Sequence, residues 1–339
     1  RADTLFTPSA TIDLVVPVGR QSVFARGGVG YAFYDKNTQL NRERIDLSSG
    51  VSSRFGPCVP NIMIGYTRGL NDYDDPTLGE NVENVRETKT LSGGVNCTRP
   101  TGIGLVLSAS KDWIDNSTPF LKTSDAERSS AMVGLTYGRP ALGTLTVFGS
   151  RDQTTYPNRI FDDGYDMTAI GLTFQRQLGA RIEGTATVSR NLVDSHAPSF
   201  LGGGNEQSTT AYSGSLTYRA SSRLRFIGSF DRAVTPTSSV GSNYDVSESY
   251  RLSSTYEVGS RIVLNAGVRR VKRDAETPVV LPLVQLTDST VDSVFGSVRY
   301  KQSDRLSFVL SAGHEVRTAN APQFEYTNNR IGISADVSF

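Results

Sequence analysis

The stretch from Arg261 to Arg269 reads RIVLNAGVR and alternates between two kinds of side chain. Its apolar set falls at every second position, namely Ile262, Leu264, Ala266 and Val268. Successive side chains of an extended strand point to opposite faces, so this pattern predicts a β-strand with one apolar and one mainly polar face. The same alternation recurs at residues 181–188, 223–231, 305–313 and 333–339.

The segments that join these strands alternate in length. Short turns marked by Gly, Pro or Ser fall at residues 56–57, 99–101, 139–141, 178–180, 220–222, 258–260 and 302–304. Longer polar segments lie between them, at residues 71–84, 116–124, 156–163, 194–207, 236–243 and 274–287. Short turns at one end and long loops at the other are typical of bacterial outer-membrane barrels.

The strand pattern and the loop lengths together predict an all-β fold. We expect a transmembrane antiparallel up-and-down β-barrel over residues 22–339, with about 16 strands and at most about 18. Residues 1–21 are expected to form an N-terminal segment in the periplasm or the lumen, although residues 10–18 could also form another strand.

Composition excludes other classes of protein. Hydrophobic residues make up 37% of the chain, and no stretch reaches the roughly 18 to 20 apolar residues of a membrane-spanning helix. Lys and Arg total 35 against 34 for Asp and Glu, so a nucleic-acid partner is not expected. The N-terminus lacks the basic and apolar regions of a signal peptide, and we expect that such a peptide has been removed.

If the apolar face contacts lipid, the polar face lines a lumen. The charged residues expected to point inward are Glu183, Arg223, Arg225, Asp231, Arg251, Glu257, Arg261, Arg269, Arg305 and Asp336. Each one singly is expected to pair across strands and to hydrate the wall. Together they predict a polar conduit, in which the planar arginine fork could contact carboxylates or phosphates of anionic sugars.

Few residues suit catalysis or metal binding. His196 lies in a long loop, and His314 is expected to point outward near the membrane edge, with Glu315 pointing inward. The acidic stretch at residues 71–76 lacks the Gly and the terminal Glu of a calcium loop. We therefore expect no enzymatic activity, no bound metal and no other cofactor.

Two cysteines, Cys58 and Cys97, have no His or Asp at metal-ligand spacing. They lie beside two successive short turns, so neighbouring strands could bring them to the same rim. Both alternatives, free thiols and a single disulfide, remain open on the sequence. The oxidising compartment permits the disulfide, and mass analysis under non-reducing conditions would detect it.

Two stretches resemble known families. Residues 331–339, IGISADVSF, resemble the C-terminal strand of outer-membrane proteins, whose final Phe, here Phe339, is recognised by the barrel-assembly machinery. The run VPVGRQ at residues 16–21, followed by YAFYDKN at 31–37 and QLN at 39–41, resembles the start of the β-barrel porin type 2 family. That resemblance implies a single barrel and a role in export of exopolysaccharide or capsule, together with a periplasmic polysaccharide-export protein.

The resulting expectation is a non-enzymatic porin in the outer membrane of a Gram-negative bacterium, surrounded by membrane lipids and lipopolysaccharide. Polysaccharide export is the first hypothesis for its function. The alternatives are a general diffusion porin for small solutes and a plugged structural or adhesive barrel.

Overall fold

The computed structural model describes residues 3–70, 84–99, 101–159, 164–196, 207–236, 244–276, 288–320 and 322–338. These residues form one antiparallel sheet of 18 strands and short 3-10 helices. The strands are β1 (Leu5–Phe6), β2 (Ser9–Val18), β3 (Gln21–Tyr34), β4 (Arg42–Ser53), β5 (Val59–Leu70), β6 (Val85–Cys97), β7 (Gly102–Asn116), β8 (Ala126–Arg139), β9 (Gly143–Thr155), β10 (Tyr165–Leu178), β11 (Ile182–Ser195), β12 (Gln207–Arg219), β13 (Leu224–Pro236), β14 (Tyr244–Val258), β15 (Ile262–Glu276), β16 (Asp288–Lys301), β17 (Leu306–Ala319) and β18 (Tyr326–Val337). The 3-10 helices are η1 (Thr38–Leu40), η2 (Pro119–Ser124) and η4 (Pro322–Phe324). Among the described residues, no helix is long and apolar enough to span a membrane.

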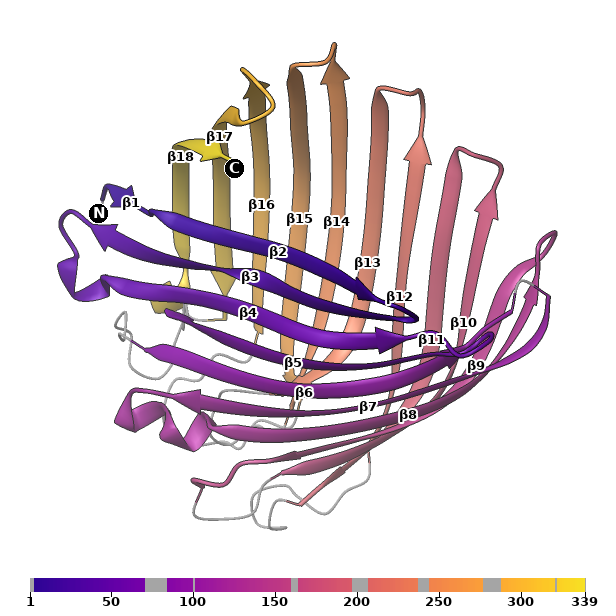
Figure 1. The fold of residues 1–339 in the computed structure, drawn as a ribbon. Helices are drawn as coiled ribbons and strands as arrows, with labels where there is room; N and C mark the ends of the chain where they lie inside the picture. Colours follow the sequence, from indigo (N-terminus) through magenta and orange to yellow (C-terminus); the bar gives the residue numbers. More distant parts are fainter. Residues whose placement is uncertain are drawn as a thin grey trace.

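From β2 to β18, each strand pairs with the next one along the chain. β1 and β2 both pair with β3 in one register, since Leu5 faces Tyr34 and Ser9 faces Gly30. Pro8, which has no N–H to donate, lies between them, so β1 and β2 form one interrupted strand. The sheet curves round on itself, with β2–β8 in one wall and β10–β18 in the opposite wall (Figure 1).

The expected barrel topology is confirmed. The strands β3 to β18 are the sixteen that the alternation predicts, and the predicted short turns agree with the observed ones to within about two residues. The sheet also begins earlier than the expected start at residue 22, because residues 9–18 form β2. Its alternating Ile12, Leu14 and Val16 explain this pairing, which takes up much of the segment set apart as residues 1–21.

The two faces of the sheet differ in exposure as well as in polarity. Along β10, Tyr165, Met167 and Ala169 are buried, whereas Ile170 and Leu172 on the other face are exposed. Side chains converge on the concave side of a curved sheet and diverge on its convex side, so the apolar face points outward. The exposed surface is 20480 Å², against about 13,500 Å² for a globular monomer of this mass. The excess of exposed surface over that of a globular monomer is expected for a thin wall whose two faces are both accessible to solvent.

A small apolar cluster lies at the long-loop ends of four strands. It comprises Tyr165 and Met167 of β10, Val193 of β11, Val234 of β13, and Tyr244 and Val246 of β14. The rings of Tyr165 and Tyr244 lie 6.2 Å apart although β10 and β14 are not neighbours in the sheet. The described ends of β13 and β14 therefore lie against the concave face of β10 and β11, and the Tyr244 hydroxyl donates to Gln207 of β12.

Candidate functional site

The polar face of β10–β18 is the candidate site. Ladder pairing places Ser229, Arg251, Arg269 and Ser293 in one row across four successive strands. Ser215 of β12 and Glu315 of β17 extend the row on either side. Small hydroxyl side chains beside long charged ones leave a hydrated wall, which suits passage of polar molecules.

The register assigns the expected lumen residues to two places. Seven continue the polar-face alternation within the strands: Glu183, Arg225, Asp231, Arg251, Glu257, Arg269 and Asp336. Arg223, Arg261 and Arg305 instead lie in short turns, at the rim of the barrel and not within its wall. The alternation in the sequence predicts these three arginines as strand residues. In the structure each one directly precedes the first residue of its strand.

Two of the lumen arginines lie directly opposite each other. Arg251 of β14 pairs in register with Arg269 of β15, and like charges in this position destabilise a sheet. Among the described residues, neither guanidinium group makes an ion pair. The nearest carboxylate by register is Asp231, a diagonal neighbour of Arg251 on β13. This part of the wall therefore carries excess positive charge.

An aromatic ring supports one of these arginines. The guanidinium carbon of Arg251 lies 5.3 Å from the centre of the Phe295 ring, within the range of a cation–π contact. The ring itself lies over Gly267, where an added Cβ would come within 2.4 Å of it. The glycine makes room for the ring, and the ring supports the cation. Periodicity reads Gly267 only as a small residue, so the sequence does not reveal this arrangement.

Some other charges on the polar face are paired. Arg299 contacts Asp336 at 3.5 Å near the short-turn end, and Arg26 of β3 contacts Asp13 of β2 at 2.9 Å. These pairs neutralise charge and keep their parts of the wall hydrated, which is the role expected above for single charged residues.

Every short turn carries an arginine. The eight connections from β2–β3 to β16–β17 contain, or directly follow, Arg20, Arg54, Arg99, Arg139, Arg181, Arg223, Arg261 and Arg305. We call these residues the turn arginines. All eight are exposed, and within the described parts of the chain none of their guanidinium groups has a hydrogen-bond or ion-pair partner. The regular recurrence of arginine at the short turns is visible in the sequence. The alternation of polar and apolar residues indicates only three of the eight, Arg223, Arg261 and Arg305, as lumen residues.

The outward face carries ion pairs toward its long-loop end. They include Arg68–Glu43, Lys111–Glu127, Arg151–Asp166, Arg232–Glu248 and Arg270–Asp292. By register each lies on the apolar face, level with or above aromatic residues such as Tyr250. Charged pairs beside amphipathic rings are expected at the boundary between membrane and water.

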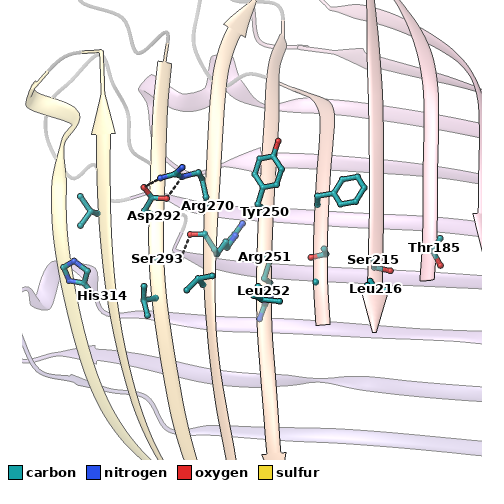
Figure 2. A pocket seen from close by; sticks show the side chains of 17 residues that line it. Thr185, Ser215, Leu216, Tyr250, Arg251, Leu252, Arg270, Asp292, Ser293 and His314 are labelled. Carbon is teal, nitrogen blue, oxygen red and sulfur yellow. Dashed lines mark hydrogen bonds and ion pairs between the residues drawn. The ribbon is translucent and has the colours of Figure 1, made fainter. Parts of the chain in front are cut away.

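A groove of about 1090 Å³ crosses this outward face between two rows of side chains. Leu252 lies in one row, and Tyr250, Arg270 and Asp292 lie in the other. Figure 2 shows Arg270 and Asp292 joined side by side, with Tyr250 next to them and His314 further along. Residues of the polar row also line the groove, namely Ser215, Ser229, Arg251, Arg269 and Ser293.

The remaining candidates for chemistry are placed as follows. His314 lies on the outward face, as expected, and its Nδ1 is 2.7 Å from Oδ1 of Asn329. His196 Nε2 lies 3.9 Å from Asp166 at a loop boundary. The acidic stretch 71–76 and Phe339 lie outside the described residues. Among those described, no three metal-ligating side chains gather.

A disulfide joins Cys58 to Cys97 across two successive turns of the short-turn rim. Cys58 directly precedes β5, and Cys97 is the last residue of β6, so antiparallel pairing of the two strands brings the residues together. Of the two alternatives that the sequence leaves open, the structure contains the disulfide. It ties two strand ends at the rim and leaves the polar face untouched.

Comparisons with known proteins bear on the fold. No protein-family model matches the sequence, and no curated protein is significantly similar to it. The apoprotein form of the FrpB iron transporter (F5-1 variant) from Neisseria meningitidis has a TM-score of 0.54 at 9% identity, covering 94% of this chain and 61% of that one. A mutant of the ferric enterobactin receptor PfeA from Pseudomonas aeruginosa has a TM-score of 0.51 at 11% identity, covering 94% of this chain and 65% of that one.

The chain spans less than two thirds of the length of these two solved structures. At such low identity the similarity concerns the fold, which is that of an outer-membrane β-barrel. The outer-membrane location expected from the sequence agrees with this fold. The comparisons do not extend to the β-barrel porin type 2 family.

Proposed function

We propose that the protein is an outer-membrane conduit for polar solutes. The observation that carries the proposal is the polar concave face, where Ser229, Arg251, Arg269 and Ser293 form one row across β13–β16 while apolar side chains point outward. A channel wall must exchange hydrogen bonds with hydrated solute, and hydroxyl and guanidinium groups supply donors for this.

The cargo that we propose is exopolysaccharide or capsule, exported together with a periplasmic polysaccharide-export protein. Support comes from the resemblance of residues 16–41 to the β-barrel porin type 2 family and from the chemistry of the wall. Sugars present many hydroxyl groups, and Ser215, Ser229 and Ser293 offer hydrogen-bond partners for them. Single hydroxyl groups bind a sugar weakly, so they would not hold back a moving polysaccharide chain. The periplasmic partner would meet the barrel at its short-turn rim.

Single-channel conductance of the purified protein in a planar bilayer tests this proposal. We expect current to appear, or to rise severalfold, when a periplasmic fraction is added on the side of the short turns. A large steady current that the fraction leaves unchanged would identify a general diffusion porin. Silence under both conditions would contradict a conduit and favour a plugged barrel, in which the cluster around Tyr165 and Tyr244 would be part of the closure.

A further inference from the structure

The turn arginines form a regular ring, and their backbone holds them in place. The carbonyl oxygen of Arg181 accepts a hydrogen bond from Arg219 at 2.7 Å, that of Arg223 from Glu257 at 2.9 Å, and that of Arg261 from Lys301 at 2.7 Å. Arg20 and Arg305 accept equivalent bonds from the neighbouring strand end at 3.0 and 2.9 Å. At these five arginines the backbone pairing of the sheet therefore extends into the turn, which fixes the position of their backbone at the rim.

Nearby carboxylates do not cancel this charge. Asp304 contacts Lys301 at 2.8 Å, and Asp336 contacts Arg299 at 3.5 Å, so both serve cations other than the turn arginines. The ion pair with Lys301 holds the pKa of Asp304 below its usual value. Glu257 lies at the same rim as the last polar-face residue of β14, and Glu183 lies there as the first polar-face residue of β11. The rim carries a net positive charge with these acidic groups included.

Most of the ring faces the lumen. Arg181, Arg223, Arg261 and Arg305 continue the alternation of the polar face at the ends of their strands, and Arg20 and Arg54 do so on the opposite wall. Arg99 and Arg139 instead continue the outward face. A ring built to contact lipid headgroups would follow the outward face throughout. Its predominantly inward phase favours a ligand in the mouth of the barrel.

Spacing indicates the size of that ligand. Neighbouring turns are two strands apart, which is about 10 Å across the sheet, and this is close to the Debye length of about 8 Å at physiological salt. Their fields therefore overlap at the mouth. One exposed guanidinium stabilises an anion by less than about 1 kcal/mol, so a small monovalent anion would bind weakly. A chain with repeated charges contacts several arginines at once and gains by multivalency.

We propose that the turn arginines make the short-turn mouth a capture site for a soluble anionic polymer, such as a polysaccharide bearing carboxylate groups. The proposal deepens the conduit function, on which it rests, by naming the class of cargo as acidic. The ring concentrates this polymer at the mouth, and Arg251 and Arg269 offer further positive charge deeper in the wall.

Binding of fluorescent dextran sulfate to the full chain in zwitterionic nanodiscs tests the proposal, with neutral dextran of equal length as the control polymer. The variant R261Q/R305Q removes two inward turn arginines, and R99Q/R139Q removes two outward ones as the matched control. We expect R261Q/R305Q to weaken dextran sulfate binding by roughly threefold to tenfold. R99Q/R139Q should change it less than twofold, and raised salt should abolish it in all forms.

Equal binding of neutral dextran, or equal losses in both double variants, would overturn the proposal. It would also fail if the substitutions changed only the binding of vesicles containing anionic phospholipid, because the ligand would then be the membrane. Binding is measured without current, so failure of the conduit is distinguishable from failure of the capture site. All four substituted side chains are exposed, and heat-modified migration on gels verifies that each variant folds.

Discussion

Gly267 offers a direct test of how the polar face is built. An alanine Cβ at this position would lie 2.4 Å from Cζ of Phe295 and 2.9 Å from the backbone oxygen of Leu252. Neither distance is tolerable, and the second atom belongs to the backbone, so both the ring and the strand must shift. Overpacking of this kind costs about 1 to 3 kcal/mol.

Gly296, on the neighbouring strand β16, is the matched control for Gly267. An added Cβ there would come no closer than 3.7 Å to any atom, which is ordinary contact. Gly→Ala at an unstrained site stabilises a protein by about 0.4 to 1 kcal/mol through the unfolded chain. We therefore expect Gly267→Ala to be less stable than Gly296→Ala by about 2 kcal/mol.

Urea unfolding in detergent micelles measures this difference, with the single tryptophan, Trp113, as the fluorescent probe. Adding Phe295→Leu to Gly267→Ala should recover part of the loss, because the nearer of the two clashes disappears. Equal stability of Gly267→Ala and Gly296→Ala would refute the reasoning. The absence of any coupling between positions 267 and 295 would show that the ring does not lie over the glycine.

Three further predictions follow from the described contacts. Cys58→Ser with Cys97→Ser opens a link of sequence separation 39 and should lower the unfolding free energy by up to about 4 kcal/mol; a midpoint unchanged by the substitutions or by reducing agent would contradict this. Val193→Ala, at a side chain only 1% exposed, should cost about 2 kcal/mol in the same urea assay, whereas Val188→Ala on the exposed face should cost little. Hydrogen bonds led by the backbone N–H of Lys36, with others from Asn37, lower the pKa of Asp3 to about 2. Since the folded pKa lies below the unfolded one, this anchoring of the N-terminal segment is complete above about pH 4 and disappears as the pH falls through about 2. In the native chain, protection of the Lys36 and Asn37 amides from hydrogen exchange should fall over this pH range, whereas in Asp3→Asn it should not change with pH. The same pH profile in both proteins would disprove the role of the Asp3 carboxylate.

The sequence predicts the wall of the barrel well because that wall depends on local rules. Alternation over 261–269 fixes which side chains share a face, and the register follows from turns such as residues 259–261. The same rules place Arg251 and Arg269 on the polar face. They are less exact at strand ends: Arg261 continues the polar-face alternation, but it precedes the first residue of β15 and lies in the turn at the rim.

Contacts between distant strands could not be predicted in this way. The cluster around Tyr165 and Tyr244 forms because the described ends of β13 and β14 lie against the concave face of β10 and β11, and this depends on the curvature of the whole sheet. Phe295 over Gly267 depends on the diagonal geometry of neighbouring strands, and a list of apolar positions does not contain it. The sequence leaves open whether residues 10–18 form another strand or part of a periplasmic or luminal segment. The pairing of β2 with β3 shows that they form a strand.

If the polar face lines a conducting lumen, its charged residues must set the ion selectivity of the pore. The measurement is the reversal potential under a KCl gradient, with the periplasmic fraction present, for the native protein, R251E/R269E and the outward-facing control R190E. We predict a shift toward cation selectivity in R251E/R269E and none in R190E. Unchanged selectivity in R251E/R269E, or an equal shift in the control, would contradict the account.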